Sequence, residues 1–225
     1  MVVIIRIGGS VIASPTDPQL IEQYVRLLIK LKEKGHQILA VVGGGALARQ
    51  FITAGKQLGL DQPAQDKLAI HVSQLYALIF TLKLDKHGTK LVPRTISNAI
   101  EAMRRDEIVV MGGLQPGMTT DTVAALLAQK TKAQLLIKAT DQNGIFTRDP
   151  KTHPDAKKLD RTTFQHLAKL LEHDRHEAGI HQILDPTAMK ILQETGTRTI
   201  IVNGNNPQNI QFAIHGKQVG TTVTE

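Results

Sequence analysis

The sequence predicts a single α/β domain, a three-layer sandwich in which helices cover a mainly parallel central sheet. Apolar runs alternate with amphipathic stretches along all 225 residues, as strand–helix repeats do. Three of the apolar runs end in glycines and are followed by a helical pattern, which is typical of the carboxyl ends of parallel strands. No linker, low-complexity tract or repeat divides the chain, so we expect one domain over residues 1–225.

The amino-terminal elements follow this alternation closely. Residues 2–7 are apolar and are predicted to form a buried strand, and residues 18–33 carry apolar side chains at helical spacing. Residues 37–42 are predicted to form the next strand. Helices are then expected over residues 46–58 and 66–85.

The remaining elements are predicted from the same signals. Short strands are expected at residues 91–93 and 108–111, and a buried strand at 134–139, which a loop through Pro154 follows. Three further helices and a late strand complete the chain, at residues 120–131, 162–172, 186–194 and 199–202.

The composition is that of an ordinary folded protein, with 41% apolar and 21% charged residues. No apolar run reaches the roughly 20 residues that a membrane helix needs, and the apolar amino terminus is too short for a signal peptide. Cysteine is absent, which excludes disulfides and thiolate metal sites and fits a cytoplasmic protein. We therefore expect a cytoplasmic chain with no membrane partner.

The formal net charge of +7 favours anionic ligands. Nucleic acid is one candidate, and a phosphate-rich small substrate beside solvated lysines is another. Aromatic residues make up only 3% of the chain and the basic residues are scattered, whereas nucleic-acid binding usually needs stacking surfaces or a dense basic run. We therefore expect no nucleic acid partner, and a merely solvated basic surface explains the charge equally well.

The glycines at the strand ends are the strongest chemical signal. We call residues 8–9, 43–45 and 112–113 the first, second and third glycine loops. Glycine allows backbone N–H groups to approach a phosphate, and the helix that follows adds partial positive charge. The chain has neither a GxxxxGK[ST] loop nor a GxGxxG fingerprint with a following acidic residue. The loops alone therefore predict an α/β enzyme that holds phosphates from two ligands.

A specific resemblance begins at residues 112–121, GGLQPGMTTD, which are followed by TVAALLA. This segment resembles the GGxxPGxTTD-AVAA segment of the archaeal-type uridylate (UMP) kinases, members of the amino-acid-kinase superfamily. The opening IRIGGSVI resembles the IxKIGGS opening of amino-acid kinases. Other segments resemble the archaeal uridylate kinases in the same order: VVGGGALARQFI, ATDQNGIFTRDPKTHPDAK, AGIHQILDPTAMKI and VGTTV. Together they span nearly the whole chain.

The resemblance implies the amino-acid-kinase fold and a reaction. An acceptor-side lobe would cover roughly residues 1–130, and an ATP-side lobe roughly 131–225. ATP would phosphorylate UMP to give ADP and UDP, a step of pyrimidine nucleotide biosynthesis, with Mg²⁺ bridging the donor phosphates. Catalysis in such enzymes is in-line positioning and charge stabilisation. The resemblance also implies a homo-oligomer, a hexamer.

The resemblance implies roles for individual residues as well, and no protein metal ligand. The expected catalytic residues are Arg6, Asp141 and Asp185. The residues expected to bind ATP are Gly8, Gly9, Ser10, Thr140, Gly144, Phe146, Asp149 and Lys190. The residues expected to bind the acceptor are Gly43, Gly44, Gly45, Arg49, Asp66, Gly113, Thr119 and Thr120.

Several of these residues could instead have purely structural roles. Arg49 could be a solvated helix residue, and Asp66 or Asp185 a helix N-cap, for which aspartate is favoured. Phe146 could belong to the core, and the threonines at 119–120 could simply cap a helix.

Two departures from the family pattern concern the expected catalytic residues. Arg6 stands where many relatives place a lysine, which keeps the charge but changes its geometry. Asp141 and Asn143 are exchanged relative to the usual TNVDG, although Asp141 can still organise the donor phosphates or their metal.

Two more departures lie elsewhere. On the acceptor side, residues 66–77 should read DxxGIxxTRxNA but carry Ala69, Ser73, Gln74 and Tyr76 instead. Histidines gather at His166, His173, His176 and His181, which suits either a transition-metal patch or a solvated helix surface.

The altered acceptor helix keeps two rival functions open. One is a kinase of the same fold with another small acceptor. An isopentenyl phosphate kinase would need a histidine just after the second glycine loop, where residues 46–48 are Ala-Leu-Ala. The other is a non-catalytic nucleotide-binding storage or regulatory protein similar to the molybdenum-storage proteins.

Overall fold

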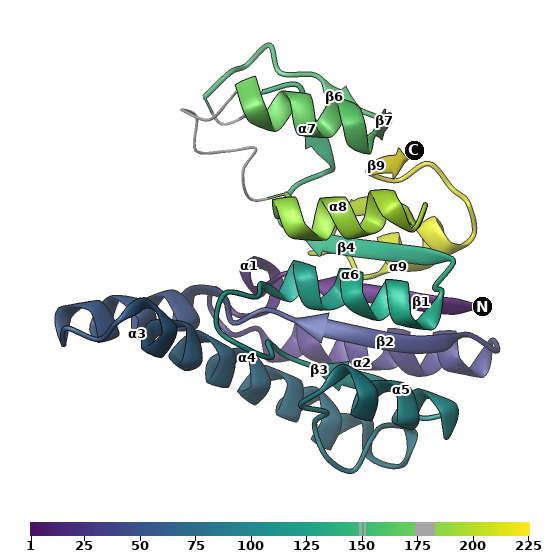
Figure 1. The fold of residues 1–225 in the computed structure, drawn as a ribbon. Coiled ribbons are helices and arrows are strands. Elements are labelled where there is room, and N and C mark those ends of the chain that lie inside the picture. The colour runs from purple at the N-terminus through teal and green to yellow at the C-terminus, as the bar shows by residue number, and fades with distance from the viewer. Residues whose placement is uncertain (149, 151, 174–182) are drawn as a thin grey trace.

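The central element is a sheet that lies between two layers of helices (Figure 1). The computed structural model describes residues 1–148, 150, 152–173 and 183–225. In the described residues, seven strands form the main sheet in the order β3-β2-β1-β4-β8-β9-β7, and β5 and β6 form a small hairpin. The strands are β1 (Val2–Ile7), β2 (Gln37–Val42), β3 (Val109–Met111), β4 (Leu135–Thr140), β5 (Ile145–Phe146), β6 (Lys158–Leu159), β7 (Arg161–Thr163), β8 (Arg198–Asn203) and β9 (Thr221–Thr224).

The sheet is mainly parallel, as predicted. β1 pairs in parallel with β2 and β4, and β2–β3, β4–β8 and β7–β9 are also parallel pairs. Only the β8–β9 pair of this sheet runs antiparallel in the described residues. The carboxyl ends of the central strands therefore meet at one edge, which is where an open α/β sheet binds its ligands.

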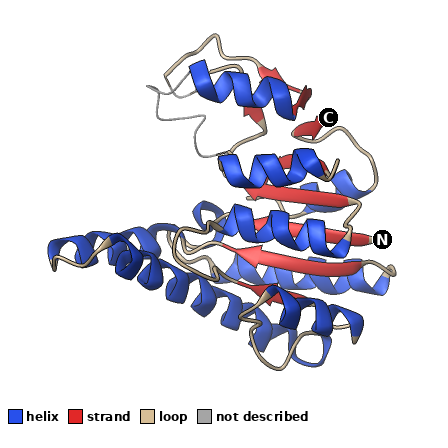
Figure 2. Ribbon diagram, viewed as in Figure 1, coloured by secondary structure: helices blue, strands red, loops and turns tan. Residues whose placement is uncertain are grey.

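Helices cover both faces of the sheet (Figure 2). The helices are α1 (Gly9–Ile12), α2 (Pro18–Glu33), α3 (Gly45–Gln57), α4 (Gln62–Leu84), α5 (Ile96–Arg104), α6 (Thr120–Thr131), α7 (Phe164–His173), α8 (Pro186–Glu194) and α9 (Gln208–Ile214), with a short 3₁₀ helix η1 (Asp85–His87). Apolar side chains of α2, α4 and α9 pack on one face, and those of α5, α6, α7 and α8 form a second core on the other. The three-layer prediction is thus confirmed.

Figure 1 shows α3 and the beginning of α4 extending beyond the sheet, at the end toward which β2 and β4 point. The three glycine loops follow β1, β2 and β3 and therefore lie at this same end. The amino terminus lies at the opposite end of the molecule. The fold thus gathers the sequence motifs at one edge of the sheet.

Three predicted elements need correction. α4 begins at Gln62, four residues earlier than expected, because the Asp61 side chain accepts a hydrogen bond from Ala64 N and Pro63 suits the first turn. Residues 91–93 do not form a strand, and the nearby backbone pairing is an isolated bridge between Gly88 and Ile108. The predicted helix at 162–172 is divided into β7 and α7.

α4 is more apolar than expected. By length and composition, the stretch Gln62–His87 would be able to cross a membrane, but core helices of folded proteins pass the same test. Here α4 packs against α2, α3, β2 and β3. Its outer face nevertheless leaves an apolar stripe exposed, which we call the α4 stripe: Leu75, Leu78, Ile79 and Leu82.

Candidate functional site

The first and second glycine loops touch each other through their backbones. A Cβ placed on Gly9 would lie 2.1 Å from the backbone nitrogen of Gly45, and one placed on Gly45 would lie 2.3 Å from the carbonyl oxygen of Gly9. Gly45 also has a φ of +59°, which glycine adopts most easily. Ser14 ties the loops together, because its hydroxyl donates to Gly9 O at 3.1 Å and accepts from Ala46 N at 2.8 Å.

The unusual residues of α4 support the third glycine loop. Gly113 N donates to the Ser73 hydroxyl at 2.8 Å, and the Gln74 side chain donates to Gly113 O at 3.0 Å. Tyr76 shares a 2.5 Å hydrogen bond with Thr16, in the segment after the first loop. The departures from the family pattern at these positions therefore have a structural role.

Arg6 lies where the first two loops and α6 converge. Its Nε is 2.7 Å from Asp121 Oδ1, and its Nη2 donates to the Thr120 hydroxyl at 2.9 Å. A Cβ placed on Gly8 would lie 3.1 Å from Nη1, and one on Gly43 would lie 3.5 Å from Nη2. The absence of side chains in both loops therefore gives the guanidinium its room. A cation in this position can serve phosphates held by either loop.

A buried lysine that sequence reasoning missed completes this cluster. Lys138 of β4 is the register partner of Arg6 and is only 2% exposed, and its Nζ lies 2.6 Å from Asp121 Oδ2. Burial lowers the pKa of Lys138 to about 8, although the Asp121 carboxylate opposes this shift. Burial alone would raise the pKa of Asp121, but Arg6 and Lys138 hold it below its ordinary value. The sequence feature that could have revealed Lys138 is its position as a charged residue inside the apolar run 135–139.

The contact between Arg6 and Asp121 is close but poorly aligned. Among the described residues, neither Arg6 Nε nor Asp121 Oδ1 has a hydrogen-bond partner of good geometry, even though the two atoms are within ion-pair distance. Buried polar atoms are normally satisfied. Catalytic hydrogen bonds are often loose before substrates bind and tighten afterwards. This ion pair can therefore tighten, although its two atoms are buried and face each other rather than an open site.

The expected ATP side lies around the end of β4. Asp141 Oδ1 accepts hydrogen bonds from the hydroxyl groups of Thr140 at 3.0 Å and Ser10 at 3.4 Å, so the first glycine loop and this strand end are joined. Asn203 at the end of β8 donates to Asn143 Oδ1 at 2.8 Å. The structure therefore brings together three of the residues that the sequence predicted for the reaction and for ATP.

Two more predicted ATP residues follow, Gly144 in the same loop and Phe146 in β5. Gly144 has a φ of +137°, and a Cβ there would lie 2.6 Å from the Thr221 hydroxyl, so glycine is required. Phe146 pairs with Lys158 in the hairpin and is half-buried rather than part of either core. Its contact with adenine stays a prediction.

Asp185 is a helix cap, as one alternative predicted, and it does more. It accepts a 2.9 Å hydrogen bond from Ala188 N at the start of α8. It also accepts hydrogen bonds from the Thr119 hydroxyl at 2.5 Å and from the Thr122 hydroxyl at 3.0 Å. Thr119 in turn caps α6. Asp185 thus joins the amino-terminal ends of α6 and α8.

Asp66 is not a helix cap, because Asp61 caps α4 and Asp66 lies in the following turn. One of its oxygens accepts from the Gln62 side chain at 3.0 Å, and the other accepts from Gly117 N at 2.8 Å. Asp66 therefore connects α4 with the loop between β3 and α6.

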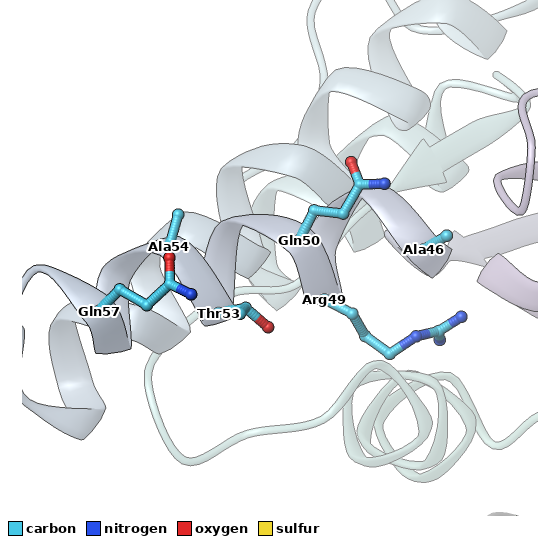
Figure 3. Close-up of a pocket in the computed structure, with 6 residues that line it drawn as sticks. All are labelled: Ala46, Arg49, Gln50, Thr53, Ala54 and Gln57. Atoms are coloured by element: carbon cyan, nitrogen blue, oxygen red, sulfur yellow. The ribbon is translucent and has the colours of Figure 1, made fainter.

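Arg49 is an exposed residue of α3, which agrees with the alternative of a solvated side chain. It lines a shallow hollow of about 430 Å³ together with Ala46, Gln50, Thr53, Ala54 and Gln57. Figure 3 shows its guanidinium extended toward the Ala46 end of the helix, which is the end next to the second glycine loop. From there it can approach an anion bound at that loop.

Other predicted residues are not brought into this cluster. Lys190 has a 77% exposed side chain, with its nitrogen 4.0 Å from Glu194. Asp149 lies outside the described residues, as do His176, His181 and the side chain of His173. His166 hydrogen-bonds Thr162, and the described residues contain no group of three or more potential metal-binding side chains.

Comparison with known proteins identifies the family of the chain. The family model described as "Amino acid kinase family" matches residues 1–203. A uridylate kinase of Natronomonas pharaonis is 37% identical over 99% of this chain and 98% of its own, and one of Methanothrix thermoacetophila is 37% identical over 99% of both chains. The crystal structure of a uridylate kinase from Archaeoglobus fulgidus aligns over 100% of both chains with a TM-score of 0.89 and 32% identity. The chain belongs to the amino acid kinase family.

Proposed function

We propose that this protein transfers the terminal phosphoryl group of ATP to UMP, giving ADP and UDP. The backbone contact between the first and second glycine loops, with the Arg6 guanidinium at their junction, carries the proposal. Two phosphate-binding loops in contact hold a donor and an acceptor phosphate close enough for in-line transfer. The uridylate kinases among the relatives support UMP as the acceptor.

In this proposal, the first glycine loop and Ser10 hold the donor phosphates, and the second loop and Arg49 hold the acceptor phosphate. Arg6 neutralises the charge that develops on the transferred phosphoryl group. Such electrostatic stabilisation by preorganised groups usually contributes more to catalysis than any other single effect. Asp185 contributes by fixing the start of α6, which carries Thr120 and Asp121. Residues roughly 1–130 would form the acceptor-side lobe and 131–225 the ATP-side lobe.

Mg²⁺ is the metal that such a reaction uses, and the chain offers a fitting partner for it. Mg²⁺ binds through one or two carboxylates and the substrate phosphates, and it keeps several waters. The exposed carboxylate of Asp141, next to Ser10 at the first loop, supplies oxygen ligands of the right kind. When bound, the ion would neutralise charge on the donor phosphates.

Turnover against a panel of acceptors tests the proposal. We would measure ADP release from Mg-ATP with UMP, CMP, dUMP, AMP, isopentenyl phosphate and no acceptor. Turnover with UMP above all others is expected. Turnover with another acceptor would replace the substrate but keep the ATP site. ATP binding without turnover would favour a storage or regulatory protein.

Replacing Asp66 by Asn is expected to raise the KM for UMP by about tenfold and to leave the KM for Mg-ATP within about twofold, since the loss of a charged hydrogen-bond acceptor costs roughly 1.5–3 kcal/mol. The reason is that Asp66 anchors Gly117, in the loop between the third glycine loop and α6. Steady-state kinetics with each substrate varied would measure both constants. Asp61→Asn, which keeps a capping side chain, serves as the control. Equal changes in both KM values would contradict the assignment.

We also propose that the chain is a cytoplasmic homo-oligomer, a hexamer, assembled partly through the α4 stripe. Four large apolar side chains in helical register on one face are typical of a buried contact.

Leu82→Lys is expected to dissociate this contact, because a charge would then be buried in it. Leu91→Lys is the control, because Leu91 is 81% exposed and Leu82 is 71% exposed, but Leu91 lies outside the stripe. Analytical ultracentrifugation of both variants measures the oligomeric state. If Leu82→Lys has the same oligomeric state as the wild type, the α4 stripe is not part of the subunit contact.

A further inference from the structure

We propose that Lys138 is a positioning residue for phosphoryl transfer, because it fixes the Asp121 carboxylate that aims the Arg6 guanidinium at the junction of the first two glycine loops. This inference rests on the proposed kinase function and deepens it. Its geometric basis is one carboxylate shared by two cations. Oδ2 of Asp121 is held by Lys138 at 2.6 Å, and Oδ1 faces Arg6 at 2.7 Å.

The two halves of this cluster differ in hydrogen-bond geometry. Lys138 is almost completely enclosed between β4 and α6, so its contact with Asp121 is a short hydrogen bond shielded from water. The Arg6 half has the poorly aligned contact described above. The carboxylate that Lys138 holds therefore keeps Arg6 at the loop junction, where Thr120 also accepts a hydrogen bond from Arg6 Nη2.

Arginine at position 6 makes such support valuable. The guanidinium is planar and directional, whereas an ammonium group acts as a point charge. A displaced Asp121 would therefore misdirect the Arg6 fork as well as move it. Lys190, the other lysine expected at the site, has a 77% exposed side chain, so Lys138 is the buried lysine of the site in the part of the chain that the structure describes.

The charge of the cluster also depends on Lys138. Among the described residues, the charged groups that act on it include Arg6 from β1, Asp121 from α6 and Asp185 at the start of α8. When Lys138 loses its proton, the cluster loses one positive charge. It then stabilises less well the negative charge that develops on the transferred phosphoryl group. Activity should therefore require the protonated lysine.

The first test compares Lys138→Met, which keeps the length of the side chain, with Lys138→Arg and the control Lys130→Met. Lys130 is an exposed residue at the far end of α6. Lys138→Met is expected to lower kcat about 100-fold while both KM values change less than about threefold, since a misplacement of about 1 Å can cost that much in rate. Lys130→Met should match the wild type. Circular dichroism and thermal melts establish that each variant is folded.

The pH profile supplies a readout that a merely structural lysine would not change. In the wild type, kcat/KM should fall as the pH rises through about 8, where free-enzyme Lys138 loses its proton, because this is its pKa. Lys138→Arg should extend the plateau to higher pH, because arginine stays charged. A folded Lys138→Met with wild-type kcat, or a wild-type profile that Lys138→Arg leaves unchanged, would overturn the proposal.

A second experiment requires neither turnover nor a folded Lys138→Met protein. In wild-type protein with ¹³C-labelled lysine, NMR follows the Lys138 side-chain signal, assigned by its loss in Lys138→Arg. A non-hydrolysable Mg-ATP analogue should raise its pKa, because the bound phosphates favour the charged form. A pKa that the analogue leaves unchanged refutes the role of Lys138 even if UMP is phosphorylated. If the pKa rises but UMP is not phosphorylated, the proposed function alone fails.

Discussion

Replacing Gly9 by Ala is expected to lower the turnover of UMP and Mg-ATP about 1000-fold or more. The new methyl group would lie 2.1 Å from the backbone nitrogen and 2.6 Å from the Cα of Gly45. Both obstacles are backbone atoms, so no side chain can turn away, and the first and second glycine loops must separate. A separation of about 1 Å already costs about 100-fold in rate, and here donor and acceptor phosphates would both move.

The same substitution should also lower the free energy of unfolding by about 2–3 kcal/mol, as overpacking does in a tightly packed site. Kinetics and denaturant unfolding of the purified variant measure the two effects. Gly35→Ala is the matched control, because a Cβ there meets no atom within 4 Å. Gly35 has a φ of +81°, so its replacement should cost about 1 kcal/mol of stability but no activity. A folded Gly9→Ala protein with wild-type turnover would contradict the contact between the loops.

Replacing Asp121 by Asn is expected to reduce the free energy of unfolding by about 3–5 kcal/mol at pH 7, because the buried Lys138 and the partly buried Arg6 both lose the carboxylate that they share. Arg6 and Lys138 both have Asp121 as an ion-pair partner. The rate should fall about 1000-fold as well, since Arg6 then loses the group that aims it. Denaturant unfolding and steady-state kinetics measure the two losses.

The penalty in Asp121→Asn should shrink as the pH rises. The pKa of folded Lys138 is already below its ordinary value, and removing the carboxylate that opposes the shift lowers it further. The unfolded chain then binds more protons than the folded one up to about pH 10.4, the ordinary pKa of lysine. The stability of the variant therefore increases with pH in this window. The wild type gains in the same way only above its Lys138 pKa of about 8, so the penalty shrinks below about pH 8 and is constant above it.

Asp106→Asn is the matched control for the Asp121 variant. Asp106 pairs with Lys32 but is 76% exposed, so the same change of charge should cost less than about 1 kcal/mol and no activity. If Asp121→Asn is no less stable than Asp106→Asn at pH 7, the cluster around Asp121 does not contribute to the free energy of unfolding as expected.

The sequence predicted well those features that depend on local pattern. α2, α6 and α8 have the predicted bounds because caps or prolines mark their starts. The glycine loops could be recognised because consecutive glycines directly after a buried strand indicate a close backbone approach or a tight turn. β9 was missed: it is a short strand rich in threonine, whose position in the sheet depends on its pairing with β8 and β7.

Other features required the three-dimensional structure. Lys138 and Asp121 lie 17 positions apart, and only the return of the chain from α6 into β4 brings them together. A single lysine in an apolar run does not reveal such a partner. The roles of Ser73 and Gln74 were likewise hidden, because they become clear only when the third glycine loop is seen to rest on α4.

The contact between the first and second glycine loops has a consequence for redesign. Loops that bind phosphate through backbone groups contact the group that all nucleotides share. Because the two loops are in contact, a change in one loop displaces the other. On the proposed function, discrimination between acceptors would come from side chains around these loops, on α3, α4 and the loop before α6. An engineer who seeks a new acceptor should keep the glycines and vary those surfaces.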